Sequence, residues 1–282
     1  MLSDQRFGQK EWRGTMRKNK KVFLILLTCG TLLLAGCKEG ISKEDYRMAG
    51  ITALDEGRYE EAVTQFDEAI SHSNGLVGKF ELDVLKYRAE AEYAMGDYTS
   101  AAQTYQILLQ ADEEKAEYYY FLSMAQASMG ELSKAQESFE KGKTLKQDAS
   151  GSGEARLVLG QELLKQGQTE EAMTLLEEAM SQGTASPALY NQIGLCYLKQ
   201  DEPQKAAEAF EQGITMWEQE QTDTAEVSPS EDSVKQELLF NQVVAYEYCS
   251  DFAKARELLE AYVTVYTEDE EAKRELEFLK TR

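Results

Sequence analysis

A short pattern recurs six times along this chain of 282 residues, and it constrains the fold more than any other feature. The clearest copy reads Gly57-Arg-Tyr-Glu-Glu-Ala62, and looser copies centre on five later alanines. These six register alanines are Ala62, Ala101, Ala135, Ala172, Ala206 and Ala255. They are separated by 39, 34, 37, 34 and 49 residues, which is a period of 34 with insertions. Self-similarity at a period of this length indicates stacked copies of one supersecondary unit.

Two upstream positions follow the same period. A small residue stands twelve positions before five of the six register alanines, and a large residue stands sixteen positions before five of them. The first set is Gly50, Ala89, Ser123, Gly160, Gly194 and Val243, and the second set is Tyr46, Leu85, Tyr119, Arg156, Tyr190 and Leu239. Small residues let two helices of a unit approach closely, while large residues fill the space between neighbouring units. Val243 and Arg156 are the exceptions.

This register resembles the tetratricopeptide repeat, a helix-turn-helix unit of 34 residues. The resemblance implies an all-α solenoid, a right-handed superhelix of about six repeats over residues 43–266 and a capping helix over 267–282. The helix pairs are expected to start near Lys43, Leu82, Ala116, Gly153, Pro187 and Gln236. The usual late proline is absent throughout, and Asp201 and Pro203 stand where the family has glycine and an aromatic residue.

Two segments interrupt the repeats. The run Ala149-Ser-Gly-Ser-Gly153 predicts a short flexible joint between repeats three and four. The acidic stretch near 218–233 predicts a disordered insert between repeats five and six. That insert is either a tolerated surface loop or a regulatory, partner-binding segment, and both interpretations stay open.

The amino terminus has the composition of an export signal. Seven basic residues and two acidic ones precede an apolar run of 14 residues from Val22 to Ala35, which is too short to span a bilayer as a helix. The run ends in a sequence that resembles the lipobox of bacterial lipoproteins, Leu34-Ala35-Gly36-Cys37. The resemblance implies that residues 1–36 are a signal peptide, cleaved before a lipidated Cys37, and that 37–42 form a short tether. The alternatives are an uncleaved signal anchor and an ordinary buried hydrophobic segment, and Met16 is an alternative start.

Composition excludes several functions. The net charge is -21, so a nucleic-acid backbone is not expected as a partner. The single histidine of the chain argues against histidine-ligated metal sites and histidine-based catalysis. We therefore expect no catalysis, no cofactor and no small-molecule substrate. Cys196 and Cys249 are expected to be free, because the repeat register places them on similarly oriented faces.

In the tetratricopeptide family the first helix of each repeat lines a concave surface. The residues of this chain that match those positions are Ile51, Leu54, Tyr93, Tyr120, Met124, Leu157, Leu164, Leu195, Leu198, Phe240, Val244 and Tyr248. An apolar surface flanked by acidic residues favours a peptide or an amphipathic helix with apolar anchors. The alternative is that part of this stripe packs within the array.

These features predict a membrane-anchored extracytoplasmic lipoprotein that binds a protein or peptide partner at the bacterial cell envelope. Its acyl chain would hold it at the cell membrane, or at the outer membrane if the source has one. The alternative function is a permanent structural subunit of an envelope assembly or secretion complex.

Overall fold

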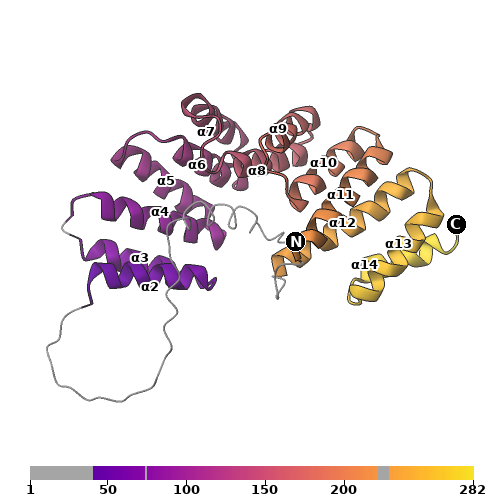
Figure 1. Ribbon diagram of the computed structural model, residues 1–282, viewed down its shortest axis with the longest axis horizontal. Coiled ribbons are helices and arrows are strands. Elements are labelled where there is room, and N and C mark those ends of the chain that lie inside the picture. The colour runs from indigo at the N-terminus through magenta and orange to yellow at the C-terminus, as the bar shows by residue number, and fades with distance from the viewer. Residues whose placement is uncertain (1–40, 74, 222–228) are drawn as a thin grey trace, which may run out of the picture.

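The computed structural model describes residues 41–73, 75–221 and 229–282. Over these residues the chain forms thirteen α-helices and no strand. The helices follow one another around an arc, with α2 (Lys43–Asp55) and α14 (Glu270–Leu279) at its two ends (Figure 1). The predicted all-α fold is therefore confirmed.

Twelve of the helices form six consecutive hairpins, each of which is one repeat. The hairpins are α2 with α3 (Tyr59–Ser71), α4 (Lys79–Ala94) with α5 (Tyr98–Ala111), α6 (Ala116–Ser128) with α7 (Leu132–Leu145), α8 (Ser152–Lys165) with α9 (Thr169–Ser181), α10 (Pro187–Lys199) with α11 (Pro203–Gln221), and α12 (Pro229–Tyr248) with α13 (Phe252–Val265). The last helix, α14, buries Ala272, Leu276 and Leu279 in a cluster shared with α12 and α13. It covers the open end of the solenoid, as a capping helix must.

Local sequence explains where several helices begin. Ser42 forms a capping box with Asp45 at the start of α2, and the Ser186 side chain caps α10 ahead of Pro187. By contrast, α4 begins at Lys79 rather than near Leu82, because Glu81 accepts a hydrogen bond from the Gly78 backbone N–H at 2.9 Å.

The predicted disordered insert is shorter than expected. Helix α11 continues through Gln221, and α12 already begins at Pro229 rather than near Gln236. Proline is favoured in the first turn of a helix, since its missing N–H has no partner there in any case. Residues 218–221 and 229–233 are thus helical, which corrects the prediction for them, and residues 222–228 lie outside the described part of the chain.

The turn inside each repeat needs a residue with positive φ, five positions before the register alanine. Glycine supplies it in the first four repeats, for example Gly57 at +77° and Gly167 at +80°. In the last two repeats Asp201 and Ser250 adopt φ of 60° and 61° at the same position. The departure at Asp201 therefore preserves the turn geometry.

Close approach between the two helices of a repeat explains the small residue of the register. A Cβ atom on Gly50 would lie 2.5 Å from Cε1 of Phe66, and Gly194 faces Phe210 in the same way. Ser123 occupies this position in repeat three, where its hydroxyl donates to the Ala135 carbonyl at 2.7 Å. The register therefore encodes contact between paired helices.

The joint between repeats three and four is packed, which corrects the prediction that it is flexible. Gly151 has φ of +82°, and a Cβ atom there would lie 2.7 Å from the Phe121 ring. Ser152 and Gly153, the first residues of α8, are buried. One buried apolar cluster accordingly runs from repeat two to the first helix of repeat six, and smaller clusters occupy the two ends.

Candidate functional site

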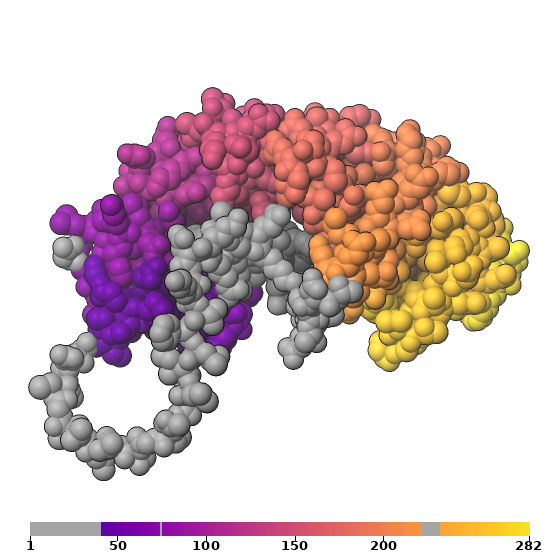
Figure 2. Space-filling model, in the orientation of Figure 1, coloured from indigo at the N-terminus to yellow at the C-terminus, as the bar shows by residue number. Residues whose placement is uncertain are grey.

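The first helices of the repeats line the inner side of the arc. In Figure 1, α6 and α8 lie inside the curve, while α7 and α9 lie outside it. Figure 2 shows the described residues as a curved body that is hollowed between its two ends. A surface of this shape can surround a partner that is itself elongated.

Half of the twelve predicted surface residues are buried. Six side chains are at most 8% exposed: Ile51, Leu54, Tyr120, Met124, Leu157 and Leu164. They belong to the first four repeats. The prediction that they line an open surface is corrected for these residues, because their side chains pack between neighbouring helices.

Tyr120 shows why the register alone misplaces such a side chain. Its ring lies 5.4 Å from the ring of Phe139 on α7, and its hydroxyl donates to the carbonyls of Lys146 and Gln147 at 3.2 and 3.0 Å. The side chain therefore packs against the second helix of its own repeat and the two residues that follow that helix. Phe240 is half-buried in a similar way, with its ring 5.8 Å from that of Tyr262 on α13.

The remaining predicted residues stay at least partly accessible, and most lie near the carboxyl-terminal end. Tyr93 is half-buried on α4, where its hydroxyl lies 3.2 Å from the Ser128 hydroxyl. Leu195 and Leu198 on α10 and Val244 on α12 are half-buried, and Tyr248 is 64% exposed. These last four side chains lie on α10 and α12, two helices that contact each other, and they are named here the carboxyl-terminal strip of repeats five and six.

A polar ladder, which the sequence interpretation missed, joins successive first helices. The side chain fifteen positions before one register alanine meets the carboxylate eighteen positions before the next. The three pairs are Arg47 Nε to Asp83 at 2.6 Å, Lys86 to Glu117 at 3.7 Å and Asn191 Nδ2 to Glu237 at 2.9 Å. Extending the register to these two positions would have revealed it. The side chains of these pairs are thus engaged within the array.

The Asn191 pair continues into a small network beside the carboxyl-terminal strip. Asn191 is 1% exposed and accepts a hydrogen bond from Asn241 Nδ2 at 2.9 Å. Burial raises the pKa of Glu237, and the hydrogen bond from Asn191 opposes that rise. The amide of Asn191 thereby fixes α10 against α12, so the strip lies on two helices held in register.

Within 41–73, 75–221 and 229–282 no three His, Cys, Asp or Glu side chains are grouped to hold a metal ion. Cys196 and Cys249 are free, and burial raises the pKa of the Cys196 thiol to about 12, so this thiol stays protonated at neutral pH.

The predicted lipobox residues Leu34, Ala35 and Gly36 and the predicted lipidation site Cys37 lie outside the described residues. Among the helices that are described, none combines the length and the apolar character needed to cross a bilayer.

Stacked hairpins with this register define the class of the chain as a helical-repeat protein. Family profiles of the tetratricopeptide repeat match residues 88–150 and 163–225. The chain therefore contains tetratricopeptide repeats and has the fold of a tetratricopeptide superhelix. No curated protein matches it in sequence.

Solved structures with the same fold have low sequence identity to this chain. The Cut9–Hcn1 hetero-tetramer of APC/C aligns with a TM-score of 0.65 and 15% identity, covering 86% of this chain and 43% of that one. A tetratricopeptide repeat protein from Parabacteroides merdae aligns with a TM-score of 0.58 and 15% identity, covering 86% of each chain. MamA from Desulfovibrio magneticus aligns with a TM-score of 0.51 and 18% identity, covering 66% of this chain and 99% of that one. This chain therefore spans less than half of the first of these, and the likenesses concern the fold alone.

Proposed function

We propose that this chain is a lipid-anchored, extracytoplasmic scaffold that binds a protein or peptide through the inner face of its repeats and performs no catalysis. The observation that carries the binding proposal is the carboxyl-terminal strip of Leu195, Leu198, Val244 and Tyr248. Apolar side chains that remain accessible on a concave, preformed surface supply the anchors that peptide recognition uses.

The chemistry around the strip favours a particular partner. Glu237 and the excess of acidic residues over basic ones in the chain favour a segment with basic residues beside its apolar anchors. The ladder of Arg47, Lys86 and Asn191 uses its own donors internally, so the partner would rely on apolar contacts more than on hydrogen bonds to these three residues.

The lipobox sequence supports the anchor. A lipidated Cys37 would leave about six residues before α2, which at ~3.3 Å per residue keeps the first repeat within roughly 20 Å of the bilayer. Tethering of this kind raises the local concentration of any partner in the same membrane. It fits a scaffold for envelope machinery.

A permanent structural subunit of an envelope assembly or secretion complex is the second candidate. The Cut9 repeat array, which shares the fold, is part of a hetero-tetramer with Hcn1. Affinity capture with stringent washing separates the two functions. A subunit retains a neighbour at fixed stoichiometry, whereas an adaptor releases its partners.

The binding surface is tested by the double variant Leu198→Glu/Val244→Glu in affinity capture from native membranes. Two carboxylates on the strip should reduce recovery of the partner at least tenfold, because apolar contact is replaced by charged groups that must be desolvated. The matched control is Ile107→Glu, which places a carboxylate at an exposed position of α5. Equal recovery with both proteins would contradict the proposed surface.

The anchor is tested separately by Cys37→Ala with metabolic labelling by a fatty acid. The variant should lose the label and either leave the membrane fraction or remain unprocessed. Undiminished labelling would rule out Cys37 as the lipidated residue.

A further inference from the structure

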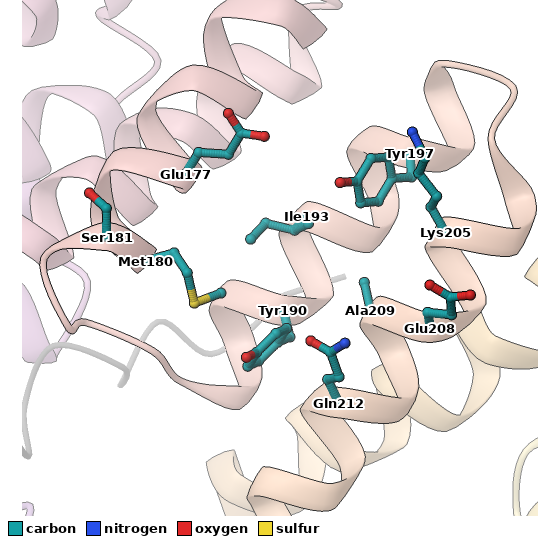
Figure 3. A pocket seen from close by; sticks show the side chains of 10 residues that line it. All are labelled: Glu177, Met180, Ser181, Tyr190, Ile193, Tyr197, Lys205, Glu208, Ala209 and Gln212. Atoms are coloured by element: carbon teal, nitrogen blue, oxygen red, sulfur yellow. The ribbon is translucent and has the colours of Figure 1, made fainter.

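A pocket with a volume of about 530 Å³ lies between the second helix of repeat four and both helices of repeat five. Ten residues line it: Glu177, Met180, Ser181, Tyr190, Ile193, Tyr197, Lys205, Glu208, Ala209 and Gln212. None of them belongs to the carboxyl-terminal strip. The volume falls within the range of sites that bind small molecules or side chains. Figure 3 shows Ile193 extending from α10 into the gap toward α9.

The floor of this pocket is apolar and aromatic. Ile193 and Ala209 are buried, while Met180, Tyr190 and Tyr197 are half-buried and keep part of their surface open. Two tyrosines on one face of α10 offer ring surfaces of the kind that attract cations. Lys205 already uses one of these rings, since its Nζ lies 5.4 Å from the Tyr197 centroid.

The rim of the pocket carries two carboxylates and one ammonium group, that of Lys205. Glu177 projects from α9 and Glu208 from α11, with Ile193 and Tyr197 of α10 between them (Figure 3). Both glutamates are exposed, and no cation of the described residues forms an ion pair with either. The nearby Lys205 is paired with Glu202 instead, and this hydrogen bond is the main cause of its raised pKa.

We propose that this pocket binds the side chain of an arginine in a polypeptide partner. The guanidinium group would lie at the rim that carries the carboxylates of Glu177 and Glu208, and the aliphatic stem would pack on Tyr190 and Ile193. Arginine fits better than lysine, because its planar head can donate two parallel hydrogen bonds to a carboxylate and can stack on an aromatic ring. A guanidinium is also more weakly hydrated than an ammonium group, so it loses less hydration free energy on entering a half-apolar site.

This inference does not depend on the lipid anchor or on the carboxyl-terminal strip. The pocket lies on the face of α10 that turns toward α9, whereas Leu195 and Leu198 belong to the strip that α10 shares with α12. A partner could therefore occupy one site without the other, and each site can be disabled separately.

The test uses fluorescence anisotropy with the purified full chain. The probe is a fluorescein-labelled pentapeptide with a central arginine flanked by leucine and glycine. A second peptide carries citrulline, which keeps the shape of arginine and removes its charge. The protein variants are Glu177→Gln/Glu208→Gln and the control Glu60→Gln/Glu113→Gln, which removes two exposed carboxylates that do not line the pocket.

The expected result is about tenfold tighter binding of the arginine peptide than of the citrulline peptide. The pocket variant should remove that difference, and the control variant should keep it. A circular dichroism spectrum equal to that of the parent chain would show that the pocket variant is folded. Equal affinities for the two peptides, or equal losses in the two variants, would overturn the proposal, as would failure of the parent chain to bind either peptide.

Discussion

Arg156 and Tyr190 occupy the same register position in consecutive repeats, sixteen residues before the register alanine, yet they produce opposite junctions. Arg156 is 0% exposed and closes the contact between repeats three and four. Tyr190 is half-buried and lines an open pocket between repeats four and five. One position of the repeat can therefore close a junction or leave it available to a ligand.

The difference between the two junctions follows from the hydrogen-bond partners of each side chain. The Arg156 guanidinium donates to the Ser152 carbonyl at 2.8 Å and to Glu178 Oε2 at 3.3 Å, and it lies 5.2 Å from the Phe139 ring. These partners come from both repeats, so the arginine holds them together. Tyr190 has a side chain of similar size but only one hydroxyl group for hydrogen bonding, and the space beside it stays open.

The largest effect is expected from Arg156→Ala. Truncation leaves a cavity in the junction and removes the donors from buried carbonyl groups, so the free energy of unfolding should fall by about 3 kcal/mol. The half-buried Tyr190→Ala should cost only about 1–2 kcal/mol. Urea unfolding followed by circular dichroism measures both. Equal losses would show that the two junctions do not differ in the way described.

A smaller effect is expected from Gly151→Ala, compared with Gly167→Ala. Both glycines have φ near +80°, so each alanine should cost about 1 kcal/mol in backbone strain. Only at Gly151 does the added methyl group meet a ring, that of Phe121, which should add about 1–3 kcal/mol. Thermal unfolding of the two variants separates the contributions. A Gly151 variant no less stable than the Gly167 variant would contradict the packed joint.

The smallest effect on stability is expected from Glu247 on α12. Unlike Arg156, whose charge is stabilised by a carboxylate and a carbonyl, this carboxyl group lies beside a second acidic residue. Burial raises its pKa to about 7, with a further contribution from Glu275 on α14. The native state thus binds a proton more tightly than the unfolded chain, so stability should decrease as pH rises from about 4.5 to 7. Glu247→Gln should remove this decrease, which we expect to be below about 1 kcal/mol because the group keeps solvent contact. Melting temperatures at pH 5 and pH 8 test it, and an unchanged pH dependence would exclude the assignment.

The sequence was sufficient for the parts of the fold that repeat. Gly50 and Gly194 predicted a close approach between the paired helices, and the structure shows that they face Phe66 and Phe210, because each repeat must satisfy the same helix-to-helix distance. It was insufficient where one residue departs from the pattern. The exception Arg156 was visible as a charged residue at a position that is otherwise apolar or aromatic. Its partners, the carbonyls of Gln147 and Ser152, depend on the path of the joint, which no local pattern specifies.

The binding surface was predictable only in part, for a related reason. A register position fixes which side of a helix a residue occupies, but the rotamer and the neighbouring helix decide its exposure. Tyr120 and Tyr248 were both predicted at the inner face, and the structure buries the first and exposes the second. The pocket between repeats four and five was not predicted at all, because its lining comes from three helices whose spacing is set by tertiary packing.

The central claim is that the inner face of repeats five and six holds a partner polypeptide. The most direct measurement replaces the exposed Tyr248 with a photo-reactive benzoylphenylalanine and irradiates intact cells. The same replacement at Ile107, an exposed residue of α5, provides the comparison. We predict a discrete cross-linked product at residue 248 and none at residue 107. Products of equal yield at both sites, or none at residue 248, would contradict the account.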